Sequence, residues 1–337
     1  MTLNNITLWN GKSVPRIGIG TWVMGGEQYA NGKPTGWANV DDATSIQTLH
    51  KAFELGVRII DTSGSYGAGH SEKIIARAIK ESKFSREDFV ICTKAGIVCD
   101  ASSGDIIGTT DKKNDIEAAI DASLGRLQTD YIDLVKFHLN RHPIEKSHGV
   151  FEAFSDAYSS GKIGAFGWSN DELEGGLAFT NLNGYVAVQH DLNIFSPANN
   201  LLRGIEEHAL WSFNRQPLAM GLLSGKYNGK SSKVGDNDIR SSGVEWLRYF
   251  DREGAPTIEL VEAVEQIRAL LTSDGRTVAQ GALGWCLAQS EMAIPLPGCR
   301  TPAQAIDNFG VLKLPPMDSE IVAEINNVLS ELQRPIE

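Results

Sequence analysis

The chain has few cysteines and no long apolar run. Its four cysteines, Cys92, Cys99, Cys286 and Cys299, show neither CxxC spacing nor the spacing of zinc ligands. No apolar run approaches the roughly 20 residues that a membrane-spanning helix needs. Residues 1–6 lack the basic and apolar regions of a secretory signal. These absences predict a soluble protein of the cytoplasm, where thiols stay reduced, with no membrane partner.

Positive charge is also scarce. The chain has 31 Lys and Arg against 42 Asp and Glu, which gives a net charge of −11. Nucleic acids and anionic membranes are bound through basic surfaces, so we expect neither as a partner. A content of 42% hydrophobic and 22% charged residues is typical of a globular protein that can bury a large core.

The common motifs for metals and nucleotides are missing as well. His138 and His142 are four residues apart, but Pro143 would break a helix there and the chain has no HExxH motif. We therefore predict no metal site. Residues 18–23 lack the third glycine of GxGxxG, and residues 11–13 lack the upstream glycine of a phosphate-binding P-loop. A nucleotide would have to be held in another way.

The sequence does contain a regular alternation of short apolar runs and helical segments. We predict eight strands, at Val14–Gly20, Val57–Asp61, Phe89–Lys94, Tyr131–His138, Ala165–Ser169, Ala187–Gln189, Leu210–Phe213 and Ala293–Leu296. The clearest helices are predicted at Asp42–Leu55, Ser71–Glu81, Asn114–Leu127 and Gly149–Ser160. Such alternation favours a parallel sheet with helical crossovers. Eight repeats without a linker predict an α/β fold, a (β/α)8 TIM barrel, as a single domain over residues 1–337.

Two kinds of connecting segment extend this prediction. Asn10-Gly11 between β-prone runs indicates a short N-terminal β-hairpin that covers one end of the barrel. Long loops are predicted at the carboxyl ends of strands, at Val23–Val40, Gly96–Asp111 and Asn228–Pro256. Their aromatic residues suggest the apolar rim of a pocket, and we predict substrate contacts at Trp22 and Trp37.

Four polar residues follow the predicted strands. Asp61 and Tyr66 come at the end of the second strand and just after it, Lys94 ends the third, and His138 ends the fourth. The carboxyl ends of barrel strands form the face that carries the active site in such enzymes. Asp61 and Lys94 alone would be interpreted as a structural ion pair, whereas the added phenol and imidazole favour catalysis.

The chemistry of these four groups suits proton transfer to a carbonyl oxygen. A tyrosine has an ordinary pKa of about 10, so its anion needs a nearby cation. Lys94 supplies that cation, and Asp61 keeps it charged and oriented. His138 can hydrogen-bond to the carbonyl oxygen or tune the tyrosine. Such a proton source suits reduction of a carbonyl by hydride, and no side chain provides hydride, so a nicotinamide cofactor is required.

Several motifs resemble the aldo-keto reductase family, in the right order and along nearly the whole chain. Residues 61–72, DTSGSYGAGHSE, resemble the family stretch D-T-A-x-x-Y-G-x-G-x-S-E. Residues 90–94, 127–138 and 161–170 resemble its lysine-bearing strand, its L-x-T-D-Y-I-D-L-x-x-x-H block and its G-K-I-R-x-I-G-V-S-N segment. The resemblance implies a reductase of aldehydes or ketones, or an alcohol dehydrogenase, in which Tyr66 is the general acid.

The resemblance also implies a cofactor site, formed by Thr21, Trp22, Ser169, Asn170, Gln189, Arg215, Pro217, Leu218, Met220, Gly221, Ser224, Lys226, Gly298, Arg300, Gln304, Asp307 and Asn308. Arg215 stands where many relatives stack an aromatic ring on the nicotinamide. Gln304 replaces a second clamping arginine, and Asp307 stands where glutamate is usual. Because Arg300 can pair with a 2′-phosphate, we expect NADP(H) to be favoured, with NAD(H) as the alternative.

Two other interpretations stay open. A cofactor-binding regulatory protein on the same barrel, similar to the potassium-channel β subunits, would keep the same four residues. A different barrel enzyme, such as a metal-dependent hydrolase or an isomerase, would show clustered metal ligands or a phosphate loop near the last two strands. The leading prediction is an enzyme with a small-molecule carbonyl or alcohol substrate. Nothing in the sequence indicates an oligomeric state.

Overall fold

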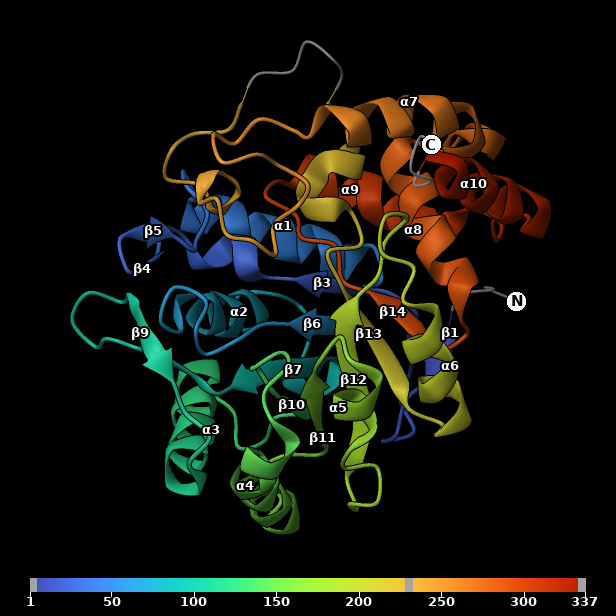
Figure 1. The fold of residues 1–337 in the computed structure, drawn as a ribbon. Helices are drawn as coiled ribbons and strands as arrows, with labels where there is room; N and C mark the ends of the chain where they lie inside the picture. Colours follow the sequence, from blue (N-terminus) through green and yellow to red (C-terminus); the bar gives the residue numbers. More distant parts are fainter. Residues whose placement is uncertain (1–4, 228–232, 333–337) are drawn as a thin grey trace.

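The centre of the molecule is an eight-stranded parallel sheet (Figure 1). The computed structural model describes residues 5–227 and 233–332. The strands are neighbours in chain order: β3 (Gly18–Gly20), β6 (Ile59–Asp61), β7 (Val90–Ala95), β10 (Leu134–Phe137), β11 (Phe166–Ser169), β12 (Tyr185–Asp191), β13 (Trp211–Arg215) and β14 (Ala293–Pro295). A parallel bridge between Gly20 and Gly298 joins the two ends of the sheet. The sheet is thus a nearly closed barrel, and the predicted fold class is confirmed.

Helices connect and surround the strands: α1 (Asp42–Glu54), α2 (His70–Lys80), α3 (Lys113–Leu127), α4 (His148–Ser159), α5 (Leu173–Leu177), α6 (Asn199–Glu207), α7 (Ile258–Leu271), α8 (Val278–Gln289), α9 (Pro302–Phe309) and α10 (Ser319–Leu332). The four clearest sequence predictions agree to within one residue at each end. The reasons are local: α1 begins where the Asp41 carboxylate accepts a hydrogen bond from Thr44 N at 2.7 Å, and it ends before Gly56, whose φ is +97°. Within the described ranges, no helix has the length and apolar character of a membrane span.

Short 3-10 turns complete the regular structure: η1 (Trp22–Gly25), η2 (Arg86–Asp88), η3 (Ile144–Lys146), η4 (Ala219–Ser224), η5 (Ile239–Ser241), η6 (Ser273–Gly275) and η7 (Gly310–Lys313). Two of them, η1 and η4, follow the carboxyl ends of β3 and β13. They therefore lie on the face of the barrel where the polar residues were predicted.

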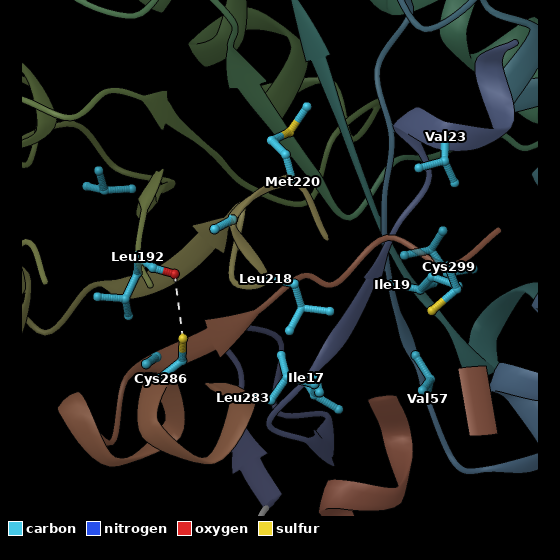
Figure 2. Packing of buried hydrophobic residues seen from close by; sticks show 14 of the residues in the cluster. Ile17, Ile19, Val23, Val57, Leu192, Leu218, Met220, Leu283, Cys286 and Cys299 are labelled. Atoms are coloured by element: carbon cyan, nitrogen blue, oxygen red, sulfur yellow. Dashed lines mark hydrogen bonds between the residues drawn. The ribbon is translucent and has the colours of Figure 1, made fainter. Parts of the chain in front are cut away.

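Alternate residues of each strand point to opposite sides, so two separate apolar clusters form. The first fills the barrel interior with Leu8, Val14, Ile59, Val90, Cys92, Leu134, Ala165, Ala187, Phe213, Ile294 and Leu296. The second, larger cluster fills the space between strands and helices. Figure 2 shows part of it, where the Cys286 thiol of α8 donates a hydrogen bond to the Leu192 carbonyl, 3.5 Å away. Because both faces are covered, β6, β7, β10 and β11 are buried at every position.

The predicted N-terminal hairpin is confirmed and closes the amino-terminal end of the barrel. β1 (Asn5–Thr7) and β2 (Ser13–Pro15) pair antiparallel on either side of the Asn10-Gly11 turn. Trp9 packs edge-on against Trp211, the first residue of β13, at a ring distance of 5.6 Å. The barrel interior is therefore sealed at the end opposite the polar residues.

Two of the three predicted long loops, residues 23–40 and 96–111, contain short strands that the sequence analysis did not predict. β4 (Tyr29–Ala30), β5 (Lys33–Pro34), β8 (Ile97–Cys99) and β9 (Ile106–Thr109) form a second sheet in the order β5-β4-β9-β8. The turn between β4 and β5 is Asn31-Gly32, with φ angles of +49° and +74°, as a two-residue hairpin turn requires. β4 and β5 have two residues each and therefore carry no alternation, which is why the pattern missed them. In the third loop, residues 228–232 lie outside the described residues.

Leu134→Ala tests the packing of the barrel interior. Leu134 is fully buried, so we expect the truncation to lower the free energy of unfolding by about 2–5 kcal/mol, measured by urea denaturation. Ile107→Ala is the matched control, because Ile107 is 64% exposed and should change stability by less than about 0.5 kcal/mol. Equal losses in the two variants would contradict a tightly packed interior.

Candidate active site

The four residues predicted to be catalytic lie together at the carboxyl ends of β6, β7 and β10. Asp61 and Lys94 occupy the inward-facing positions of their strands, two residues after Ile59 and Cys92 of the interior cluster. His138 follows the last residue of β10, and Tyr66 lies between β6 and α2. The strand pairing that closes the barrel thus brings these four side chains to one place.

The Lys94 ammonium is the centre of their hydrogen bonds. It donates to Asp61 Oδ2 at 2.7 Å, to the Thr62 carbonyl at 2.6 Å and to Tyr66 Oη at 3.1 Å. The ring of Tyr66 meets the ring of His138 edge-on, with centroids 5.9 Å apart. His138 Nδ1 lies 3.1 Å from Ser63 Oγ, which orients the imidazole.

A second lysine, which the sequence analysis missed, completes this cluster. Lys136 Nζ donates to the other carboxylate oxygen of Asp61, Oδ1, at 2.5 Å. Its side chain is fully buried, and its ammonium lies 4.8 Å from the centre of the Phe213 ring. Lys136 precedes His138 by two positions, so strand alternation alone would have placed both side chains on the same side.

Burial and charge fix the protonation states of these groups. Although burial by itself would raise the pKa of Asp61, the ammonium groups of Lys136 and Lys94 lower it to about 2, so the carboxylate is ionised. Burial, aided by Lys94 and Arg215, lowers the pKa of His138 well below its usual value, so the imidazole is neutral. Burial and the Asp61 charge raise the pKa of Tyr66, which therefore keeps its proton at neutral pH.

Arg215 lies between two acids that sequence reasoning also missed. Its guanidinium donates to Asp171 Oδ1 at 2.7 Å and approaches Asp191 Oδ1 to 3.4 Å. Burial would lower the pKa of Arg215, but Asp191 and Asp171 together raise it, so the guanidinium stays charged and is balanced locally. Asp191 follows Gln189 by two positions on β12, so alternation could have indicated that it shares the inward face.

Ser169 and Gln189 leave polar atoms unpaired in the interior. They face each other in register on β11 and β12. The hydroxyl of Ser169 and both polar side-chain atoms of Gln189 are buried without a hydrogen-bond partner. Such groups are costly unless a ligand supplies partners, and a carboxamide offers both a donor and an acceptor. These two residues therefore fit the nicotinamide carboxamide, whereas Asn170 Oδ1 already accepts from Glu172 N at 2.9 Å.

The predicted cofactor residues from Pro217 to Lys226, which the resemblance assigns to the pyrophosphate, lie on the segment after β13. This segment, residues 217–226, has left-handed backbone at Ala219, Met220 and Gly221, with φ angles of +46°, +56° and +93°. Ser224 Oγ donates to the Gly221 carbonyl at 2.6 Å, and the Lys226 ammonium lies 4.6 Å from the centre of the Tyr227 ring. Pro217 and Leu218 begin the segment one residue after the end of β13, so the segment starts at the carboxyl face.

The predicted cofactor residues from Gly298 to Asn308, which the resemblance assigns to the adenosine end, already make hydrogen bonds or ion pairs within the protein. The Arg300 guanidinium donates to the carbonyls of Ala38 and Asn39 and lies 4.0 Å from Asp238 Oδ2. Gln304 Oε1 accepts from Arg300 N at 2.7 Å. Asp307 Oδ1 accepts from Thr277, and Asn308 donates to the sulfur of Cys299. Gly298 makes the bridge to Gly20 that closes the barrel, and Thr21 Oγ1 donates to the Asp61 carbonyl at 2.9 Å.

A group of three tryptophans lies on one side of the Tyr66 ring, and Trp22 makes the contact to it. The Trp22 ring stacks on Tyr66 at 5.9 Å with an interplanar angle of 23°. It meets Trp37 edge-on at 5.8 Å and Trp246 at 6.3 Å. Both tryptophans predicted as substrate contacts thus lie in this group, and Trp246 was not predicted. In residues 5–227 and 233–332, no cluster of three or more His, Cys, Asp or Glu side chains is arranged to hold a metal ion.

The chain is similar to known proteins over nearly its full length. The family model "Aldo/keto reductase family" matches residues 16–330. "Aldo-keto reductase YhdN" of Bacillus subtilis (strain 168) is 30% identical over 322 residues, which cover 95% of this chain and 91% of that protein. "NADH-specific methylglyoxal reductase" of Escherichia coli (strain K12) is 28% identical over 322 residues and covers 91% and 93%.

Solved structures agree with the fold. The glycerol dehydrogenase AKR11B4 from Gluconobacter oxydans superposes with a TM-score of 0.82 at 25% identity, covering 100% of this chain and 98% of the other. The holo form of the aldo-keto reductase AKR11C1 from Bacillus halodurans has a TM-score of 0.73 at 21% identity over 98% and 96% of the two chains, a likeness of fold alone. With the family model spanning nearly all of it, this chain belongs to the aldo/keto reductase family.

Proposed function

We propose that this protein is an NAD(P)H-dependent oxidoreductase that reduces an aldehyde or ketone to an alcohol, or catalyses the reverse, with Tyr66 as the proton donor. The observation that carries the proposal is the hydrogen bond of the buried Lys94 ammonium to Tyr66 Oη at 3.1 Å. Membership of a family of oxidoreductases supports it. So do the names of two relatives, a methylglyoxal reductase and a glycerol dehydrogenase.

Each side chain of the cluster has a distinct task in this proposal. A reduced nicotinamide supplies hydride to the carbonyl carbon when it is bound. Tyr66 Oη gives its proton to the carbonyl oxygen as that oxygen gains negative charge, and Lys94 stabilises the tyrosinate that remains. In the tautomer that this proposal assigns to neutral His138, Nδ1 accepts from the Ser63 hydroxyl 3.1 Å away, and the Nε2 proton is donated to the same carbonyl oxygen.

The cofactor would be held by three parts of the carboxyl face. Ser169 and Gln189 would bind the carboxamide, residues 217–226 the pyrophosphate, and Arg300 with α9 the adenosine end. Trp22 and Trp37 would form apolar walls for the substrate. A cytoplasmic location and a single-domain architecture belong to the same proposal.

Tyr66→Phe tests the proton donor. Because positioned proton transfer contributes about 10²- to 10⁴-fold to rate, we expect kcat to fall by at least about 100-fold. Cofactor affinity, followed by quenching of tryptophan fluorescence, should stay within about twofold, since the phenol oxygen is not proposed to bind the cofactor. Tyr131→Phe, at the opposite end of β10, is the control and should keep its activity. Retained turnover in Tyr66→Phe would remove Tyr66 from the mechanism, and cofactor binding without any turnover in the unmodified protein would favour a regulatory role.

Gln189→Met tests the carboxamide site through two effects of opposite sign. Loss of the amide should weaken cofactor binding about tenfold, because one to two hydrogen bonds disappear. In the cofactor-free protein the same amide is buried and unpaired, so its removal should raise the free energy of unfolding by about 1 kcal/mol. Gln47→Met, on the exposed side of α1, should change neither quantity. Weaker binding together with lower stability would instead point to a structural role for Gln189.

Arg300→Ala tests the choice between NADPH and NADH. If the guanidinium pairs with a 2′-phosphate, the Kd for NADPH should rise at least about tenfold and the Kd for NADH by less than about threefold. Fluorescence titration of both cofactors measures the two constants. Arg268→Ala, in an exposed pair with Glu265 on α7, is the control. An equal rise in the Kd of both cofactors would mean that Arg300 acts through its hydrogen bonds to Ala38 and Asn39, and not by binding the 2′-phosphate.

A further inference from the structure

Beneath Tyr66, the barrel interior contains two lysine side chains that pair with a single carboxylate. Lys94 and Lys136 donate to opposite oxygens of the Asp61 carboxylate, at 2.7 Å and 2.5 Å. Both ammonium-bearing side chains are fully buried. Two lysine side chains therefore share a single carboxylate, and His138, whose pKa burial lowers, is neutral.

Lys136 is not required for the packing of this layer. It stands two positions after Leu134, whose leucine side chain fills the layer below. An apolar residue could continue that layer, and Lys94 alone already pairs with Asp61. Burying an additional ammonium costs several kcal/mol unless it is well compensated, so a buried third ion adds little to stability by itself. The position of Lys136 therefore indicates a role in proton transfer at Tyr66.

We propose that Lys136 is a positioning residue for the acid–base step, which anchors Asp61 and supplies a second buried positive charge that stabilises the anion of Tyr66. This inference rests on the proposed function of Tyr66 as proton donor. Lys136 holds Asp61 Oδ1, so Asp61 Oδ2 is directed to Lys94, and Lys94 in turn is directed to the phenol oxygen. The added charge favours loss of the Tyr66 proton, which the enzyme needs in order to act as a base in alcohol oxidation.

Several titratable groups lie around Tyr66. They are Asp61 on β6, Cys92 and Lys94 on β7, Lys136 on β10 with His138 just after it, and Arg215 on β13 with its partners Asp171 and Asp191. Burial raises the pKa of Cys92 to about 12, so that thiol stays neutral. Burial and Asp61 raise the pKa of Tyr66, while Lys136 and Arg215 lower it. Removal of the Lys136 charge should therefore raise the pKa of Tyr66 further.

Lys136→Met tests this role through the pH profile of alcohol oxidation, measured with oxidised nicotinamide cofactor. The rate rises with pH as Tyr66 loses its proton. We expect the midpoint of this rising limb of the pH–rate profile to shift to a pH about one unit higher. Below the limb the variant should be about tenfold slower, and the rate should recover as the pH is raised. Lys136→Arg, which keeps the charge, should return the limb toward its original position. Cofactor affinity by fluorescence should be unchanged in both variants.

A structural control separates this effect from loosened packing. Leu134→Ala disturbs the adjacent layer and should lower stability while leaving the limb in place. If Lys136→Met fails to bind the cofactor, Lys136→Gln, which keeps an N–H donor to Asp61, replaces it with the same expected displacement. A loss of rate that is equal at every pH, or a limb that Lys136→Arg does not restore, would overturn the role of Lys136. Absence of turnover in the unmodified protein would overturn the proposed function itself.

Discussion

The carboxylate of Asp61 is the interaction on which the polar half of the barrel depends. It joins β6 to β7 through Lys94 and to β10 through Lys136, so three neighbouring strands meet at one buried anion. Without it, two ammonium groups would face each other in a medium of low polarity, where removal of one partner of a buried ion pair costs about 3–5 kcal/mol. With Asp61 present, the closed barrel strengthens both ion pairs, because it excludes the water that would weaken these charge interactions.

The two halves of the proposed cofactor site differ in whether their polar side chains already have hydrogen-bond partners when no ligand is bound. At the nicotinamide end, Ser169 and Gln189 keep polar atoms without partners, so a carboxamide would gain hydrogen bonds without displacing any. At the adenosine end, Arg300 and Gln304 hold bonds within the protein. A phosphate there would have to replace existing bonds of Arg300 to Asn39 and its neighbour. Under the proposed function, the first half is ready to bind and the second must rearrange its contacts.

Much of the barrel could be predicted from sequence because the pattern behind it is local. Strands buried on both faces appear as short apolar runs, and the four clearest helices agree with the structure to within one residue at each end. β4 and β5 escaped prediction since two-residue strands show no alternation. Lys136 was missed because it lies inside an apolar run, where its neighbours outweighed it. The pairing of Arg215 with Asp171 could not be read from sequence, because 44 positions separate the two residues and only the closed sheet brings them together.

The second sheet makes two loops into a single mechanical unit. β4 belongs to the loop after β3 and β9 to the loop after β7, yet Ala30 and Ile106 form a parallel bridge between them. Gln28 donates to the Gly104 carbonyl at 2.8 Å, and Tyr29 N donates to the carboxylate of Asp105 at 3.1 Å. An insertion or deletion in one loop would thus displace the other, and Trp22 and Trp37 with it. Grafting a loop from a relative to change substrate preference would therefore require both segments to be exchanged together.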